Sequence, residues 1–295
     1  MVKCALILAL TGLSCAAADL VADVRGAAEE NDFTRADGYI RSFEGQRGQT
    51  PESILALSWI ARTAFAQKRY DQADRYAQET YQRVQKELKK RTLDREADLP
   101  LALGASIEVQ AQVLATKNQR TEAVSMLEAE LKKYSATSIH ARIQKNINLL
   151  SLEGKPAPPL LGVSLPKGKP ALLFFWAHWC GDCRAEAPIL AQLKKEYGPK
   201  GLVLIGPTQK YGYIGADDVP PSVELPHIEK IRREYYAAVV DGPAPVSEQN
   251  FLNYGVSTTP TLALVDRRGM VRLYHPGGIT YQELRSAIEG VLQRP

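Results

Sequence analysis

The chain has 295 residues, of which 45% are hydrophobic and 24% charged, and its formal net charge is +4. These values are ordinary for a globular protein with enough apolar residues to build a core, and the length suggests two domains. Nucleic-acid binding is not expected, because the basic residues are scattered and form no stripe within a recognised binding motif.

The first eighteen residues predict an export signal. Lys3 is followed by an apolar run from Ala5 to Leu13, and small residues then lead to Ala18. This run is about half of the ~20 residues needed to cross a bilayer, so we expect cleavage after Ala18 and no membrane-spanning segment in the mature chain. In the alternative, Cys15 becomes a lipid-modified N-terminus, as in bacterial lipoproteins. Both interpretations place the protein outside the cytoplasm, with the periplasm as the expected compartment.

Residues 19–150 predict a helical domain. Thr50 is a suitable N-cap and Pro51 a suitable first helical residue for a helix whose apolar face contains Leu57, Ile60 and Ala64. A small residue recurs three positions into successive helix starts, as in Phe33-Ala36, Tyr70-Ala73 and Arg120-Ala123. The pattern partly resembles tetratricopeptide repeats, which implies paired helices that could bind a protein partner. A generic helical bundle without a partner is the alternative.

Residues 151–170 are rich in proline and glycine and predict a linker that leads into the next domain. From 171 to 295 strands and helices alternate: strands are expected over 171–177, 201–206, 261–266 and 270–275, and helices over 180–197, 227–236 and 281–292. The alternation predicts parallel pairing, whereas the last two strands form an antiparallel hairpin. The expected fold is therefore α/β, a mixed sheet with helices on both faces.

Two cysteines stand where the first of these strands gives way to a helix. After removal of the signal, Cys180 and Cys183 are the only cysteines left, and a disulfide between them would close too short a loop to restrain the unfolded chain. At a helix N-terminus the unpaired N–H groups and the helix dipole favour a thiolate. We therefore expect Cys180 to attack a partner disulfide and Cys183 to resolve the mixed disulfide.

A metal site is the weaker interpretation of the cysteine pair, which supplies only two of the four ligands of a structural zinc. The further nitrogen donors are His140, His178, His227 and His275, and no two of them have helical ligand spacing. A transient role in handling copper is another alternative, because soft thiolate ligands suit that metal. The sequence predicts no bound cofactor and no metal.

The stretch FFWAHWCGDCRAEAP, residues 174–188, resembles the active site of the thioredoxin superfamily, and more closely that of exported TlpA- and ResA-like thiol–disulfide oxidoreductases. EGKPAPPL before the domain, with Arg184, Glu186 and Pro188 after the cysteines, matches that branch, and GVSTTPTLALVD at 255–266 is a second match to thioredoxin-like proteins. The resemblance implies a thioredoxin-like fold, a redox pair flanked by Trp179, and a disulfide between Cys180 and Cys183. It also implies a cis peptide before Pro260, with the Thr259 backbone pairing with an extended protein substrate.

Asp182, Trp179, His178 and Glu186 are expected to tune the pair. The negative charge of Asp182, which replaces the usual proline, should disfavour the nearby thiolate and make the pair more reducing. Phe174 stands where thioredoxin has a buried aspartate. Glu186 is the nearest alternative carboxylate, although a surface ion pair with Arg184 or Lys194 is the simpler expectation. His178 could stabilise the thiolate when protonated, although an exposed turn residue is the simpler interpretation.

The segment from 206 to 227 is long for a connection in an α/β unit and should emerge at the edge of the sheet that holds the cysteines. Tyr211 and Tyr213 are therefore predicted to line a substrate groove. Together these features predict an exported thiol–disulfide oxidoreductase that exchanges disulfides with a protein, with the reducing direction favoured. The alternative is a non-enzymatic adaptor in which the thioredoxin-like domain is a scaffold. Peroxide reduction is not expected, because FWAHWC, the residues leading to Cys180, contains neither the threonine or serine nor the preceding proline that a peroxidatic cysteine would need.

Overall fold

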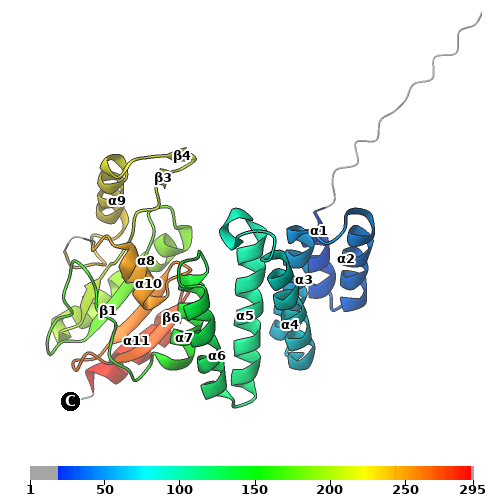
Figure 1. The fold of residues 1–295 in the computed structure, drawn as a ribbon. Helices are drawn as coiled ribbons and strands as arrows, with labels where there is room; N and C mark the ends of the chain where they lie inside the picture. Colours follow the sequence, from blue (N-terminus) through cyan, green and yellow to red (C-terminus); the bar gives the residue numbers. More distant parts are fainter. Residues whose placement is uncertain (1–18, 243, 294–295) are drawn as a thin grey trace, which may run out of the picture.

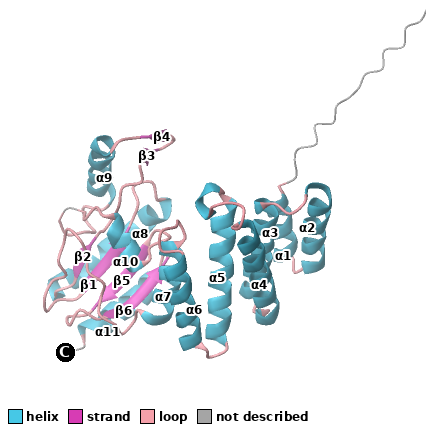
Figure 2. Cartoon of the chain, in the orientation of Figure 1, coloured by secondary structure: helices cyan, strands magenta, loops and turns pink. Residues whose placement is uncertain are grey.

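The computed structural model describes residues 19–242 and 244–293, so the predicted export signal, Cys4 and Cys15 lie outside the described residues. An all-helical region is followed by a region that contains both strands and helices (Figure 1, Figure 2). The helical region contains α1 Leu20–Glu29, α2 Phe33–Arg47, α3 Pro51–Ala66, α4 Tyr70–Glu87, the 3-10 turn η1 Leu93–Arg95, α5 Asp98–Thr116, α6 Arg120–Lys133 and α7 His140–Ser151.

Local sequence signals explain where these helices begin. Thr50 and Ser53 form a reciprocal capping box at the start of α3, with Pro51 in the first turn. Small residues such as Ala61, Ala64 and Ala73 are fully buried, which lets neighbouring helices approach closely. The predicted all-helical region is confirmed. The assignment of its helix pairs to tetratricopeptide repeats stays a prediction.

The second region contains β1 Ala171–Phe175, α8 Gly181–Tyr197, the 3-10 turn η2 Gly198–Lys200, β2 Val203–Ile205, β3 Tyr213–Ile214, β4 Asp217–Asp218, α9 Pro221–Tyr235, α10 Glu248–Tyr254, β5 Thr261–Val265, β6 Val271–Pro276 and α11 Tyr281–Leu292. The main sheet has the order β2-β1-β5-β6. β1 pairs in parallel with β2 and antiparallel with β5, and β5 pairs antiparallel with β6. The sheet is therefore mixed, as the sequence predicts.

The sheet is buried on both faces. Leu172 and Phe174 of β1 face a core that contains side chains of α8, α9 and α11. The alternate residues Leu173 and Phe175 face a second core with Phe251 and Tyr254 of α10. This is why β1 reads as an unbroken apolar run, and it confirms the expectation of helices on both faces.

Helix α9 begins at Pro221, six residues earlier than the sequence predicts. Pro221 occupies the first helical position, where the missing N–H costs nothing, and Pro226 removes one further donor without ending the helix. Between β2 and α9, the long segment folds into a two-stranded hairpin of β3 and β4.

The last helix of the helical region packs against the second region, which contains the sheet. The Nδ2 of Asn148 in α7 donates a hydrogen bond to the carbonyl oxygen of Tyr254 at 2.8 Å, and both residues are buried. Gly255 follows at φ +60°, and its Cα lies so near the α7 backbone that an added Cβ would stand 2.3 Å from the amide nitrogen of Lys145. The contact between α7 and α10 thereby brings the helical region beside the loop at 257–260.

The proline-rich segment after α7 runs along the sheet region and hydrogen-bonds to it. The amide nitrogens of Gly154 and Ala157 donate to the carbonyl oxygens of Val271 and Gly269, each at 2.8 Å. Within the described part of the chain, no helix combines the length and the apolar character needed to span a membrane.

Candidate active site

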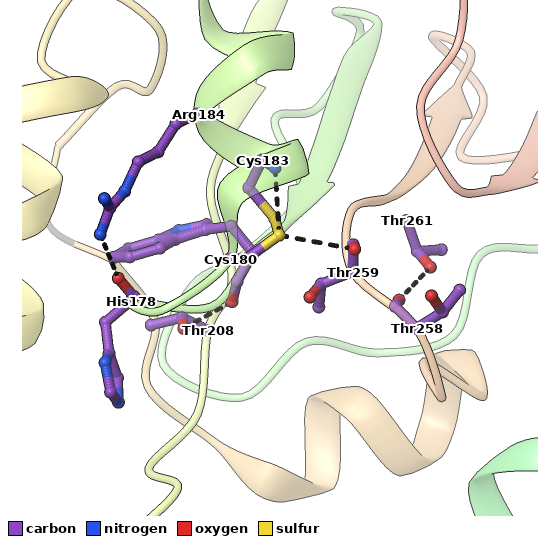
Figure 3. The surroundings of a disulfide bond; sticks show 9 residues. His178, Cys180, Cys183, Arg184, Thr208, Thr258, Thr259 and Thr261 are labelled. Atoms are coloured by element: carbon purple, nitrogen blue, oxygen red, sulfur yellow. Dashed lines mark hydrogen bonds between the residues drawn. A yellow bond between two sulfur atoms is a disulfide. The ribbon is translucent and has the colours of Figure 1, made fainter. Parts of the chain in front are cut away.

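Cys180 is the N-cap of α8, at the end of the loop that follows β1. Its Sγ accepts a hydrogen bond from the amide nitrogen of Cys183 at 3.0 Å. The two cysteines form a disulfide, and their Cα atoms lie 5.3 Å apart (Figure 3). After reduction, the same N–H and the helix N-terminus would stabilise negative charge on the Sγ of Cys180.

The neighbourhood of the pair is mostly buried. Cys180 is 3% exposed and Cys183 is fully buried, whereas the adjacent Trp179 is 47% exposed. Cys180 is therefore the sulfur nearer to solvent, and Trp179 presents a large apolar surface next to it. Asp182, in the first turn of α8, is exposed.

A second loop approaches Cys180 from the side of β5. The Thr259–Pro260 peptide bond is cis, as the resemblance implies. The carbonyl oxygen of Thr259 lies 3.5 Å from the Sγ of Cys180, and the hydroxyl of Thr261 donates to the carbonyl oxygen of Thr258 at 2.8 Å (Figure 3). The backbone of Thr259 therefore lies beside the sulfur of Cys180, and its pairing with a substrate stays a prediction.

The interior behind the cysteines is aromatic. Phe174 is fully buried and packs edge-on against Tyr236 with ring centroids 5.4 Å apart. Trp176 donates from its indole Nε1 to the carbonyl oxygen of Gly206 at 3.0 Å, which ties β1 to the segment after β2. Phe174 supplies no carboxylate at this position.

The expected surface ion pair of Glu186 is wrong. Its side chain is only 5% exposed and, among the described residues, has no ionic partner. The amide nitrogen of Ile279 donates to its Oε2 at 3.4 Å, and Oε1 has no hydrogen-bond partner in the described residues. Burial raises the pKa of Glu186 above its ordinary value, which the Ile279 N–H offsets only in part. Lys194 instead pairs with Asp241 at 2.8 Å.

The expectation of an exposed His178 is also wrong, because the residue is 2% exposed. Its Nε2 lies 3.3 Å from the Oε1 of Glu224, whose side chain is 1% exposed. Burial and then the neighbouring His227 lower the pKa of His178. The backbone of His178 is held as well, since Arg184 donates to its carbonyl oxygen at 3.0 Å.

Glu224 is a site residue that sequence reasoning missed. Its Oε1 and Oε2 accept the amide N–H groups of Tyr211 and Gly212, the second at 3.0 Å. One carboxylate thereby joins α9, the hairpin segment and the loop before the cysteines. In the sequence Glu224 looks like an ordinary acidic residue in a first helical turn, so the only available signal was its place in an unusually long segment.

Tyr211 lies near the redox pair, as predicted. It contacts Trp179 with ring centroids 5.4 Å apart, and both residues line a groove of about 120 Å³ with Thr259 and Thr258. Tyr213 lies one step further away, with its ring centroid 6.0 Å from that of His178. The use of this groove for substrates stays a prediction.

The comparisons with known proteins agree with this geometry. Residues 161–292 match the thioredoxin-like domain family. The thioredoxin-like protein YneN of Bacillus subtilis is 29% identical over 128 residues, covering 42% of this chain and 65% of that protein. The thiol:disulfide interchange protein DsbE of Yersinia pestis is 28% identical, covering 61% of this chain and 83% of that protein. DsbE of Escherichia coli is 30% identical, covering 39% of this chain and 54% of that protein.

The chain thus spans just under two thirds of the Bacillus relative and about half of the Escherichia coli relative. The matched segment contains the mixed sheet, the cysteine pair at the start of α8 and the cis-proline loop. Residues 161–292 therefore form a thioredoxin-like domain.

Proposed function

We propose that this protein is an exported thiol–disulfide oxidoreductase that reduces disulfides of a protein partner through Cys180 and Cys183. The observation that carries the proposal is the position of Cys180. Its sulfur caps a helix and accepts a hydrogen bond from the Cys183 N–H. The same sulfur lies 3.5 Å from the carbonyl oxygen of Thr259, in the loop with the cis-proline. A scaffold without redox activity needs none of these contacts.

The reaction starts from the dithiol form. The thiolate of Cys180 attacks one sulfur of the partner disulfide, a new S–S bond forms, and the partner's second sulfur leaves as a thiolate that takes up a proton. Cys183, after losing its proton, attacks the Sγ of Cys180 and releases the partner's first sulfur. Two electrons pass to the partner, and Cys180 and Cys183 end as a disulfide. A dithiol reductant must then regenerate the pair.

The charge of Asp182 favours the reducing direction. A carboxylate beside the thiolate raises the energy of the reduced form, so electrons are given up more readily. Because Asp182 is exposed, water screens this effect. The Cys183 N–H acts in the opposite sense, since it stabilises the thiolate.

The helical region is proposed to hold the partner while the cysteines react. The division proposed from the sequence is a helical-repeat domain at 19–150, an entry segment at 151–170 and the thioredoxin-like domain at 171–295. It is supported by the end of α7 at Ser151 and the start of β1 at Ala171. Export rests on the pattern of residues 1–18, with the periplasm as the compartment and a lipid anchor at Cys15 as the alternative.

Reduction of a small neutral disulfide tests the proposed activity. The reduced protein, incubated with bis(2-hydroxyethyl) disulfide, should oxidise with release of two equivalents of 2-mercaptoethanol. Cys180→Ala should abolish the reaction. An equally fast reaction in this variant, or none in the unaltered protein, would favour the adaptor function.

A further inference from the structure

A second cavity lies next to the active-site groove, between the helical region and the cis-proline loop. Its volume is about 500 Å³. Four charged side chains of α3, α5 and α7 line it together with two exposed hydroxyl residues of the loop: Arg62, Glu108, Arg142, Lys145, Ser257 and Thr258. The wall on the helical side is thus charged, and the wall on the thioredoxin-like side belongs to the loop that approaches Cys180.

The charges in this cavity do not balance. Glu108 is the only carboxylate among its lining residues, and it is shared by the Nε of Arg142 at 2.8 Å and the Nζ of Lys145 at 3.3 Å. Arg62 has no carboxylate within 4.0 Å in the described part of the chain. Three cations therefore face one anion, which leaves room for further negative charge.

A purely structural role explains only part of this cluster. The contacts of Glu108 with Arg142 and Lys145 join α5 to α7, and those three side chains are at most 20% exposed. Arg62 takes no part in that junction. Its guanidinium carbon instead lies over the Trp59 ring, 4.1 Å from the ring centroid, and that of Arg25 lies 4.6 Å from the same centroid. The stacking fixes an unpaired cation at the mouth of the cavity.

The pKa directions agree with a surplus of positive charge. Desolvation and then repulsion from Arg142 lower the pKa of Arg62. Burial lowers the pKa of Lys145, and Arg142 adds to that effect while Glu108 opposes it. A bound anion would relieve this repulsion.

The cavity adjoins the groove beside the redox pair. Ser257 and Thr258 line both this cavity and the groove that contains Trp179, Tyr211 and Thr259. Thr259 is the residue whose carbonyl oxygen lies 3.5 Å from the Sγ of Cys180. An extended polypeptide that passes Thr259, Thr258 and Ser257 would bring residues near its cysteine to this cavity, advancing about 3.3 Å per residue.

We propose that Arg62, Arg142 and Lys145 bind the carboxylate of an acidic, extended segment of the partner polypeptide, close in sequence to its reactive cysteine. The inference rests on the proposed function and names the class of its substrate. The helical region then contributes directly to substrate choice, because it supplies the cationic wall of a groove that begins at Cys180.

The test compares two synthetic peptides that each contain one cysteine, blocked as a disulfide with 2-mercaptoethanol. One peptide has aspartates at positions two to five on both sides of the cysteine, and the other has asparagines there. The reduced protein should react about tenfold faster with the aspartate peptide at low ionic strength, and added salt should reduce the difference.

The Arg62→Glu variant should lose this preference, and Arg62→Gln should lose part of it. The matched control is Arg75→Glu, which makes the same charge change at an exposed arginine that also stacks on an aromatic ring, 5.1 Å over Tyr76, away from the cavity. Arg75→Glu should keep the full preference. An aspartate preference that survives Arg62→Glu, or that Arg75→Glu abolishes equally, would overturn the inference.

Two further measurements separate this inference from the proposed activity. The rate of reaction with bis(2-hydroxyethyl) disulfide should be the same in all three variants. If the unaltered protein did not react with this small disulfide, that result would count against the proposed disulfide reduction and not against the anion-binding cavity. Binding of rhodamine-labelled peptides with serine in place of cysteine, followed by anisotropy, needs no thiol chemistry. Tighter binding of the aspartate peptide, lost in Arg62→Glu, would support the inference, and equal binding of both peptides would overturn it.

Discussion

The Nε2 of His178 lies 3.3 Å from the Oε1 of Glu224, and both side chains are almost completely buried. His178 precedes Cys180 by two residues, and Glu224 also accepts the amide N–H groups of Tyr211 and Gly212. The pair therefore joins the loop that presents Cys180 to the segment that carries Tyr211. We interpret Glu224 as a positioning residue for the groove beside the redox pair.

Glu224→Gln should loosen this segment. The amide group leaves one of the two backbone N–H groups without an acceptor, which costs about 1–3 kcal/mol. Hydrogen exchange at residues 211–219 should become about tenfold faster or more, while exchange in the helical region should not change. Glu234→Gln, at an exposed position of the same helix, is the matched control. Unaltered exchange in Glu224→Gln would remove the positioning role.

The substrate groove predicts a difference between large and small substrates. Replacement of both Tyr211 and Tyr213 by alanine removes the aromatic wall beside Trp179. The rate with the aspartate peptide disulfide should fall about tenfold, because truncation of an aromatic side chain that contacts a bound polypeptide typically costs roughly 1–2 kcal/mol. The rate with bis(2-hydroxyethyl) disulfide should stay the same. Equal losses with both substrates would mean that the tyrosines support the fold and not the groove.

Asp182→Asn should make the redox potential less negative. Removal of the carboxylate stabilises the thiolate and hence the reduced form, and an exposed charge contributes at most about 1 kcal/mol, or about 20 mV for a two-electron couple. Equilibration with glutathione measures the change. Glu122→Gln, an exposed position on α6, controls for net charge. A more negative potential in Asp182→Asn would contradict the proposed reducing bias.

The buried Glu186 predicts a specific dependence of stability on pH. Burial raises its pKa in the folded state above the ordinary value of 4.5, so the folded state binds the proton more tightly than the unfolded state. This group therefore destabilises the fold above its raised pKa, and the penalty disappears as the pH falls towards 4.5. Glu186→Gln should be more stable than the unaltered protein at pH 7 and should lose that advantage near pH 4, as measured by urea unfolding. If the stability advantage of Glu186→Gln grew as the pH fell, the pKa of Glu186 would be lowered in the folded state and not raised.

The contact between α7 and α10 can be tested at Gly255. Alanine there would place a Cβ 2.3 Å from the amide nitrogen of Lys145, at a φ of +60° that disfavours side chains. The combined cost is about 2–4 kcal/mol of unfolding free energy. Gly269→Ala is the control, because its φ is +80° but no atom lies within 4 Å of the added Cβ, so only about 1–2 kcal/mol should be lost. Equal destabilisation in both variants would mean that the two regions are not tightly packed here.

Much of the fold could be predicted from local patterns. The apolar run of β1 and the capping signals at Thr50 and Thr280 depend on neighbours along the chain, and the expected strands and helices appear with shifted ends. The redox pair was equally predictable, because the position of Cys180 between a strand and a helix is a local property.

The surroundings of the pair were less predictable because they depend on distant contacts. In the sequence Glu186 resembles a surface residue of α8, but it is buried, and its Oε2 accepts a hydrogen bond from the amide nitrogen of Ile279, 93 positions further along the chain. The sequence favours an exposed turn for His178, whereas Glu224 of α9 lies 3.3 Å from its Nε2 and both side chains are buried. The cavity that contains Arg62 and Thr258 forms only where the helical region meets the cis-proline loop. Contacts between residues so far apart in the chain cannot be predicted from the spacing of residues in one sequence.

The central claim is that Cys180 attacks and Cys183 resolves, and trapping tests it most directly. Cys183→Ala, reduced and mixed with the aspartate peptide disulfide, should accumulate a stable mixed disulfide, which mass spectrometry of a digest should locate at Cys180. The matched variant Cys180→Ala should trap little, because Cys183 is fully buried. Adducts that form on Cys183 as readily as on Cys180, or no adduct in Cys183→Ala, would contradict the account.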